Sequence, residues 1–354
     1  MGREALEALV RWLRSGRAPE PPAGADAERL VEVAEEQRVA PLLYAAVAER
    51  DDWPAAAVAR LRDRHHASFA QGVRQLALVG AVGEAFERAN VRALAMKGAA
   101  LAESVYDSVA DRPMADVDVL VLAGWDDAVA ALKGLGLGEL DRADHAWSFR
   151  DPEGGILELH HSVTSCPGLF PLDAEGLWRR SRTGTGQVRR RPGPEDLLVQ
   201  LTLHAAFQHA LGLSLVQYLD FKRLASAESL DPGRLRSAAE AAAAGPAVAA
   251  SLAVADALLG LELDPGIRDW ARDRRPTALA GWLTSSLEDP SGFVEAGPRP
   301  LVRVRWGLSQ GRRLQLVLRT LAPPSPGRRP SAVRRLLQAL ARTAGLAWRW
   351  LILR

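Results

Sequence analysis

Cysteine is almost absent from this chain of 354 residues, because Cys166 is the only one. A single thiol cannot form an internal disulfide, so a disulfide-stapled secreted fold is excluded and a reducing compartment fits. Long apolar runs are missing as well, and no stretch approaches the roughly 20 residues that cross a bilayer. The first residues, MGREALEALVRWLRSGR, lack the apolar core of a signal peptide. We therefore expect a cytoplasmic protein with no transmembrane segment.

Several patterns that mark well-known chemistry do not occur either. The sequence has no Cys/His cluster with zinc-site spacing, no Walker phosphate loop, no Ser-His-Asp signature and no internal repeat. A hydrophobic content of 48% and a charged content of 25% are those of an ordinary globular protein with a buried core. We therefore expect a globular fold that carries some other type of site.

Lysine is rare, and basic charge is unevenly distributed. Only positions 97, 133 and 222 hold lysine. Residues 297–354 contain thirteen arginines and no acid, which leaves 32 basic and 43 acidic residues, a net charge of about −11, for the rest of the chain. Such a basic segment suits nucleic acid, an anionic membrane surface or the acidic body itself. We expect it to fold back on the body, because its last helix carries an apolar stripe that needs a partner surface. A partner protein is the alternative.

The pattern along the chain predicts four regions. Residues 1–90 carry apolar side chains at helical spacing, and 91–192 contain short, strand-like stretches. Residues 193–321 return to a helical pattern, and 322–354 form a proline-rich linker followed by a basic amphipathic helix. This order predicts an α+β fold, in which a small mixed sheet is flanked by N-terminal and C-terminal helical regions.

Four short apolar stretches predict the strands of the sheet. They read VRALAMKG, DVDVLVL, AWSFRD and ILELHHSV, and a helix, WDDAVAALKGL, separates the second from the third. The turn signal DPEGG joins the last two, so we expect them to form an antiparallel hairpin. Among the helices, Pro41 is expected to begin one, Asn90 to cap the end of another, and Gly245 to interrupt an alanine-rich pattern.

An Asp-Val-Asp pair stands at the start of the second strand. Side chains alternate between the two faces of a strand, so Asp116 and Asp118 share a face. Carboxylates so close repel each other, unless a divalent cation lies between them. Mg²⁺ (or Mn²⁺) prefers oxygen ligands and keeps waters that substrate phosphates replace. Glu158 is the expected third carboxylate, brought beside the pair by the hairpin. An isolated Asp-x-Asp is usually a solvated strand or turn, but Glu158 favours a metal site here.

A lysine-glycine turn precedes the acids. The bare Gly98 allows a ligand to approach, and the first backbone N–H groups of the following helix, including that of Ala99, attract anions. Lys97 adds a point charge for a phosphate, with a plain surface lysine as the alternative. Arg112 is expected to hold another phosphate or to shield the repulsion between the acids. Asp220 is expected to lie on a helix surface or to contact Arg112 or substrate. Together these residues predict a nucleoside triphosphate site, in which an acceptor attacks the α-phosphate in line and expels pyrophosphate.

Three motifs carry these residues: MKGAAL at 96–101, RPMADVDVLV at 112–121 and LELH at 157–160. With Tyr106, they resemble the uncharacterised nucleotidyltransferase family of the DNA polymerase β-like nucleotidyltransferase superfamily. The resemblance extends upstream through VAEEQRVAPLLYAA and downstream through EDLLVQLTLHAAFQH and QYLDFKRL, so it covers roughly residues 30–225.

The resemblance implies roles for particular residues. Asp116, Asp118 and Glu158 would be the metal-binding and catalytic carboxylates, and Gly98 the glycine of the phosphate-binding turn. The superfamily turn typically continues with a serine that touches phosphate, whereas this chain reads KGAA at 97–100. Backbone donors and Lys97 would therefore take over that contact. The implied activity is a Mg²⁺-dependent transfer of a nucleoside monophosphate to a hydroxyl or phosphate acceptor.

Histidines near these motifs are candidates for supporting roles. His160 should share a strand face with the third acid, but three carboxylates already suit a hard cation, so a structural role is expected. His161 should face the opposite way. His204 is a candidate to point towards the site, although His204 and His209 lie five residues apart on an expected helix and should not share a face well.

Two other classes of function remain open. A non-catalytic nucleotide-binding or protein-interaction module on the same scaffold is favoured by the altered turn. The retention of three mutually repelling acids favours the enzyme instead. Nucleic-acid binding rests on the arginine-rich segment alone, where the interleaved aromatics are limited to Trp306, Trp348 and Trp350, so nucleic acid is not expected as a partner. No pattern in the sequence identifies the acceptor or the preferred nucleotide.

Overall fold

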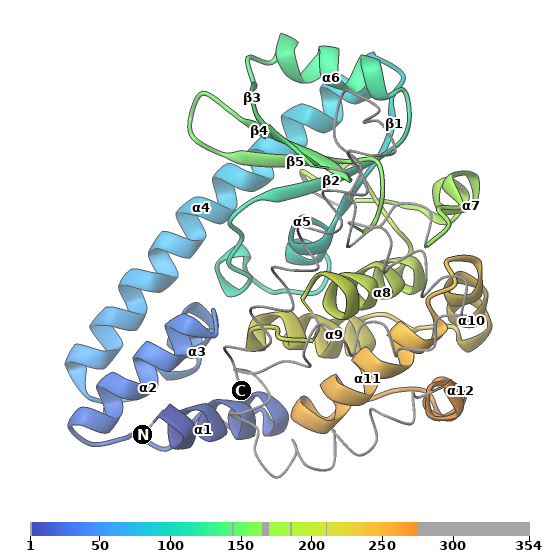
Figure 1. The fold of residues 1–354 in the computed structure, drawn as a ribbon. Helices are drawn as coiled ribbons and strands as arrows, with labels where there is room; N and C mark the ends of the chain where they lie inside the picture. Colours follow the sequence, from blue (N-terminus) through green and yellow to red (C-terminus); the bar gives the residue numbers. More distant parts are fainter. Residues whose placement is uncertain (1, 144, 165–169, 185, 210, 275–354) are drawn as a thin grey trace, which may run out of the picture.

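A computed structural model describes residues 2–143, 145–164, 170–184, 186–209 and 211–274 (Figure 1). The expected docking of 297–354, with its linker and closing helix, lies outside these residues, and so does Cys166. None of the described helices is both long enough and apolar enough to span a membrane.

Four helices precede the sheet, as the periodicity of residues 1–90 predicts. Pro41 is the second residue of the third helix, close to the expected start. The fourth helix has 34 residues and ends two residues before Asn90, whose positive φ of 54° is a backbone conformation that asparagine tolerates just after a helix. The four are α1 (Gly2–Ser15), α2 (Ala25–Glu36), α3 (Ala40–Val47) and α4 (Ala55–Arg88).

A five-stranded mixed sheet follows, in the order β1-β2-β5-β4-β3. The β4–β5 pair is antiparallel, which confirms the expected hairpin, while β2 and β5 pair in parallel. The sequence did not predict β3, because all of its residues are exposed and it lacks the alternation of a half-buried strand. The strands are β1 (Arg92–Met96), β2 (Val117–Ala123), β3 (Gly138–Arg142), β4 (Ala146–Arg150) and β5 (Ile156–His160).

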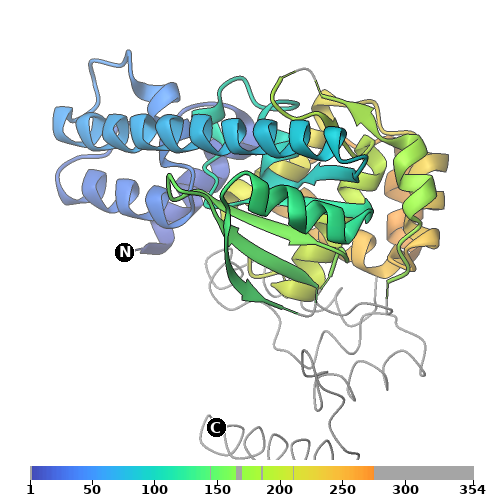
Figure 2. The same cartoon turned by 90° about the horizontal axis from the view of Figure 1, so that it is seen from above.

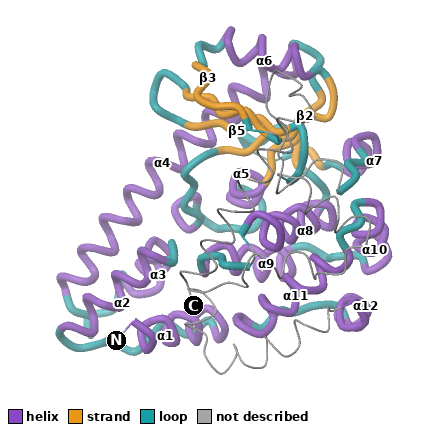
Figure 3. The backbone as a smooth tube through the Cα atoms, in the orientation of Figure 1, coloured by secondary structure: helices purple, strands orange, loops and turns teal. Residues whose placement is uncertain are grey.

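The two faces of the sheet are covered by different helices. On one face, α4 and α6 (Trp125–Gly134) lie side by side over the strands (Figures 1 and 2). Val117, Val119 and Leu157 point into this layer and are buried there. On the other face, Leu94 and Leu120 belong to the hydrophobic core that the N-terminal and C-terminal helices share. The helices nearest to this face include α5 (Lys97–Ala102), with α8 (Pro194–Leu203) packed against it (Figure 3). Asp118 alternates with these valines and therefore faces the helical part.

The helices that follow the sheet pack together with those that precede it. Pro194 begins α8, as expected, and Gly245 begins α11 after the predicted break. The first helix, α1, packs against α11, so the N-terminal and C-terminal helical regions share one hydrophobic core. The remaining elements are η1 (Val109–Asp111), α7 (Ala174–Arg180), β6 (Arg182–Thr183), β7 (Arg190–Arg191), η2 (His204–Gln208), α9 (Leu215–Ala227), α10 (Pro232–Ala241), α11 (Gly245–Leu259) and α12 (Pro265–Arg274).

Candidate active site

The pairing of β2 with β5 places two carboxylates side by side. Asp118 on β2 is the register partner of Glu158 on β5, and His160 lies two residues further along the same face. One ligand atom from each of these three residues lies within 4.8 Å of the other two. The expected hairpin is not what brings Glu158 here. The hairpin occupies one edge of β5, and the other edge pairs in parallel with β2.

Two basic side chains already contact Asp118. The ammonium of Lys97 donates a hydrogen bond to Asp118 Oδ1 over 2.6 Å. His160 Nε2 lies 2.8 Å from the same oxygen and 3.2 Å from Glu158 Oε2. Lys97 opens α5 with a positive φ of 47°, a strained backbone conformation for a residue with a side chain. The expected lysine-phosphate contact is thus, in this structure, a contact between lysine and carboxylate.

These contacts set the protonation of the group. Burial opposes the charge of Asp118, but Lys97 and His160 outweigh it and hold its pKa well below the usual range. The hydrogen bond from His160 lowers the pKa of Glu158 against a smaller effect of burial. Burial also disfavours charge on Lys97 and His160, yet the carboxylates raise both of their pKa values. The basic side chains of Lys97 and His160 therefore favour the ionised form of both carboxylates.

Asp116 lies in the bend just before β2, outside the compact group of three. Burial raises its pKa first, and repulsion from Asp118 and Glu158 raises it further. The positive charges of Lys97 and Arg38 act in the opposite direction. Asp116 is thus electrically coupled to the other two acids, although it does not belong to the compact group that they form with His160.

The donor set fits a divalent cation. Carboxylate oxygens are the ligands that Mg²⁺ and Mn²⁺ prefer, and an imidazole nitrogen is tolerated by Mn²⁺ and other transition metals. Asp118 and Glu158 offer oxygens from neighbouring strands, and His160 could offer its Nε2 only by giving up its hydrogen bonds to them. Asp118 Oδ1 already accepts from both Lys97 and His160, so a cation bound at this oxygen would replace the lysine.

The guanidinium of Arg112 is held by a further carboxylate, that of Asp220. Its Nε donates to Asp220 Oδ1 over 2.7 Å and its Nη2 to Asp220 Oδ2 over 2.8 Å. Tyr106 donates a third hydrogen bond to the same carboxylate over 2.8 Å. Burial opposes charge on Arg112, but Asp220 outweighs it and raises the pKa of the guanidinium. Of the alternatives for Asp220, contact with Arg112 is the one observed, and the pair ties the loop before β2 to α9.

The glycine turn is tightly packed. A Cβ atom on Gly98 would lie 3.1 Å from Cγ of Met114 and 3.7 Å from Nη1 of Arg112. Ala99 is also buried, with 1% of its surface exposed. A larger residue at 98 would therefore press on the side chain of Met114, which would have to move by a few tenths of an ångström, whatever binds nearby.

The expectation that His204 and His209 face apart is wrong. Residues His204–Gln208 form a π-helical turn, and the backbone N–H of His209 donates to the carbonyl of His204. This wider turn brings residues five apart into line, so the two Nε2 atoms lie 3.0 Å apart. Burial, together with the nearby charge of Lys97, lowers the pKa of His204 to about 3. His161 does point the other way, with its ring 5.4 Å from that of Trp125.

Two residues near the group were not expected from the sequence. The ring of His145, just before β4, lies 5.6 Å from that of His160, and its Nε2 is 3.2 Å from the side-chain nitrogen of Gln208. Arg38 donates to the carbonyl of Pro113, beside the Asp-Val-Asp turn. Arg38 lies within the upstream part of the family resemblance, which was the available signal. No pattern marks His145, since it stands alone in a loop.

A model of the family described as "Uncharacterised nucleotidyltransferase" matches residues 23–260, more than half of the chain. The chain belongs to this family. Its matched span runs from the residues before α2 to the end of α11, so it includes the sheet and parts of both helical regions, while α1 and α12 lie outside it. The resemblance inferred from the motifs is thereby confirmed, over a longer stretch than the motifs cover.

Other comparisons add little to the nucleotidyltransferase assignment. No curated protein matches the chain at a significant level. One similar solved structure is titled "Crystal structure of an antigenic nucleotidyltransferase-like protein from Paracoccidioides brasiliensis". It shares 17% sequence identity, the match covers 55% of this chain and 97% of that one, and the TM-score is 0.35. A likeness at this level supports no conclusion about the present chain.

Proposed function

We propose that this protein transfers a nucleoside monophosphate from a nucleoside triphosphate to a hydroxyl or phosphate acceptor. The observation that carries the proposal is the register of β2 and β5, which sets Asp118 opposite Glu158 in a chain of a nucleotidyltransferase family. Two ionised carboxylates on adjacent strands, able to share a cation once Lys97 gives up its contact with Asp118, are the arrangement that such a transfer requires.

Asp118 and Glu158 would hold the divalent cation, and Asp116 would supply a further carboxylate from the bend before β2. A bound Mg²⁺ would neutralise phosphate charge and lower the pKa of the attacking hydroxyl. Asp118 suits this role because its pKa is depressed, so that its oxygens carry full charge. Asp116, whose pKa is raised by burial and repulsion, gains most from the arrival of a cation.

Lys97 would serve as an exchangeable counter-ion. It neutralises Asp118 when no nucleotide is present, because its ammonium lies 2.6 Å from the carboxylate. The proposed step is that Lys97 leaves Asp118 and pairs with a phosphate oxygen of the incoming nucleotide. Lysine suits such an exchange because its flexible stem carries a compact point charge.

His160 would hold the carboxylates in place. Its Nε2 lies within hydrogen-bond distance of both Asp118 and Glu158, and the side chain is 2% exposed. It therefore fixes the spacing of two acids that would otherwise repel each other. His160 acts here through the carboxylates, as a positioning residue.

The test is the mass of a product. The full-length protein is incubated with Mg²⁺, each of the four nucleoside triphosphates and a panel of acceptors, including the protein itself. The expected result is an acceptor heavier by one nucleoside monophosphate, with release of pyrophosphate. Asp118→Asn and Glu158→Gln should lose this product, whereas Asp127→Asn, an exposed acid of α6, should keep it. Equal product from Asp118→Asn and wild type would contradict the proposed site.

A non-catalytic nucleotide-binding module is the second candidate. It is favoured by the contacts of Lys97 and His160, which already provide Asp118 with hydrogen-bond partners without a metal. Such a module would bind nucleotide equally well with and without Mg²⁺ and would release no pyrophosphate. Calorimetric titration of a nucleoside triphosphate in Mg²⁺ and in EDTA separates the two candidates.

A further inference from the structure

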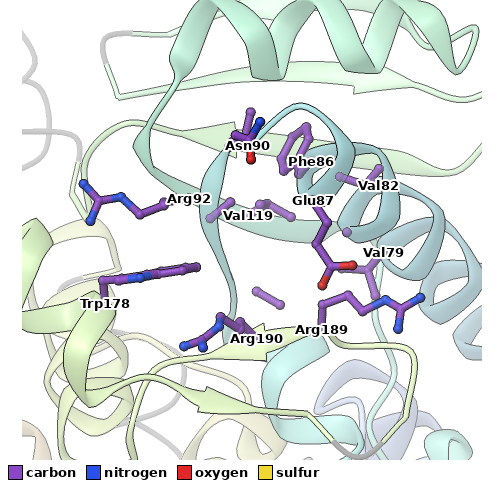
Figure 4. A pocket seen from close by; sticks show the side chains of 14 residues that line it. Val79, Val82, Phe86, Glu87, Asn90, Arg92, Val119, Trp178, Arg189 and Arg190 are labelled. Atoms are coloured by element: carbon purple, nitrogen blue, oxygen red, sulfur yellow. The ribbon is translucent and has the colours of Figure 1, made fainter.

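A cavity of about 330 Å³ lies on the sheet face opposite to the carboxylates (Figure 4). Val119 forms part of its wall and is the neighbour of Asp118 on β2, so the two side chains point to opposite faces. The cavity is bounded by the C-terminal half of α4, the edge strand β1, the helix α7 and the strand β7. Ligand sites in proteins commonly begin at about 300 Å³, so the cavity is large enough for a small molecule.

The floor of the cavity is apolar. It is formed by side chains of α4, β1, β2 and the residue just before β1, most of which are almost completely buried. These are Val79, Val82, Phe86, Val91, Ala95 and Val119. A hydrophobic group of the size of a benzene or indole ring would displace water from this floor.

Charged residues form the rim, and most of them already have partners. Arg92 makes two hydrogen bonds to Glu175, and Arg189 makes one to Glu84. Trp178 lies between the guanidinium groups of Arg92 and Arg190, which are 5.9 Å and 4.4 Å from its ring centre (Figure 4). The two arginines that have carboxylate partners are thus largely neutralised.

Two opposite charges at the rim remain. Among the residues that the structure describes, no carboxylate lies within 4.0 Å of the Arg190 guanidinium and no basic group within 4.0 Å of the Glu87 carboxylate. Arg190 is held in place by its stacking on Trp178 and by a hydrogen bond to Ser181 Oγ over 2.6 Å. A guanidinium fixed in this way loses little freedom when it binds a carboxylate. Glu87 belongs to the last turn of α4, on a different wall of the cavity.

We infer that this cavity binds a small zwitterion with a large apolar group, of the class of an aromatic α-amino acid. The carboxylate of the ligand pairs with Arg190, its ammonium pairs with Glu87, and its side chain covers the apolar floor. A polyphosphate does not suit the rim, because Arg92 and Arg189 pair with Glu175 and Glu84, and the negative charge of Glu87 offsets that of Arg190. A neutral apolar molecule would fill the floor but leave both remaining charges without a partner.

Binding to the full-length protein is measured by isothermal titration calorimetry, with L-phenylalanine and L-tryptophan as probes. At least one probe should bind saturably with one site per chain. N-Acetyl-L-phenylalanine lacks the ammonium and L-phenylalaninamide lacks the carboxylate, so each should bind at least about tenfold more weakly than L-phenylalanine. Glycine, which has no apolar group, should not bind detectably. This series uses the wild-type protein alone, so it does not depend on the folding of any variant.

Variants then assign the two charges. Glu87→Gln should weaken L-phenylalanine about tenfold and leave N-acetyl-L-phenylalanine unchanged, because that ligand has no ammonium to lose. Arg190→Gln should weaken L-phenylalanine similarly and leave the amide unchanged. Glu153→Gln and Arg179→Gln, at exposed positions outside the cavity lining, are the matched controls and should bind as wild type. The inference is overturned if no probe binds, if the acetylated or amidated ligand binds as well as the amino acid, or if both variants bind as wild type.

Discussion

Loss of the Asp220 carboxylate should be among the most destabilising single changes outside the apolar core. The side chains of Arg112 and Asp220 are 8% and 2% exposed, so solvent screens their attraction very little. Asp220→Ala removes two hydrogen bonds from Arg112 and one from Tyr106, and it leaves a buried guanidinium without its counter-charge.

The expected cost follows from that unpaired charge. Removing one partner of a buried ion pair typically costs about 3–5 kcal/mol, because the other charge stays desolvated. We expect Asp220→Ala to lower the free energy of unfolding by this amount. Asp220→Asn should cost less, since the amide keeps one oxygen that can accept from Arg112 or Tyr106. In the double variant Arg112→Met/Asp220→Ala, no buried charge remains, so its cost should be about 2 kcal/mol smaller than the sum of the two single changes.

The assay is urea unfolding followed by circular dichroism at neutral pH, with the same m-value for all variants. The matched control is Asp256→Asn, a residue of α11 whose side chain accepts from a single backbone N–H. A cost below about 1 kcal/mol for Asp220→Ala would show that the guanidinium finds solvent or another partner easily. Strict additivity of the two single changes would likewise refute the idea that the pair acts as a unit.

Three further changes test other parts of the account. Lys97→Met should raise the affinity for Mn²⁺ in the absence of nucleotide about tenfold, since it removes the ammonium that occupies Asp118, whereas Lys133→Met on α6 should not. Unchanged Mn²⁺ binding of Lys97→Met in calorimetry would refute the counter-ion role. Gly98→Ala should cost about 1–3 kcal/mol of stability because its Cβ would press on Met114, while a Cβ at Gly134 has open space and Gly134→Ala should cost nothing. Equal melting temperatures of the two variants would contradict the packing argument. Arg60 lowers the pKa of Glu35, so the stability that this ion pair adds is present above the ordinary pKa of 4.5 and is lost as the pH falls through the lower folded-state pKa. The loss of unfolding free energy caused by Glu35→Gln should therefore become smaller in acid. A loss that does not change with pH would refute the role of this ion pair.

The sheet core was largely predictable because its signals are local. The alternation of side chains along β2 predicted that Asp118 and Val119 point to opposite faces of the sheet, and the turn DPEGG predicted the β4–β5 hairpin. The parallel pairing of β2 with β5 was not predictable, since it depends on how distant segments meet and leaves no local pattern. The exposed strand β3 was missed for the opposite reason, because without a buried face it has no alternation.

The candidate site was predictable in its residue types more than in its contacts. The motifs brought Asp118 and Glu158 into one hypothesis, and the register now places them side by side. The pairing of Arg112 with Asp220 joins residues 108 positions apart and could be offered only as one alternative. The His204–His209 contact was predicted wrongly, because a π-helical turn cannot be told from an α-helix by sequence spacing.

The most direct test of the central claim is whether Asp118 and Glu158 hold a divalent cation together with a nucleotide. Mn²⁺ is titrated into the full-length protein and followed by electron paramagnetic resonance, with and without a nucleoside triphosphate whose α–β bridging oxygen is replaced by a methylene group. This measurement needs no knowledge of the acceptor. The account predicts one Mn²⁺ per chain, bound more tightly when the nucleotide is present, and loss of this site in both Asp118→Asn and Glu158→Gln. Wild-type Mn²⁺ binding in the two variants, or no Mn²⁺ binding in the wild-type protein with nucleotide, would contradict it.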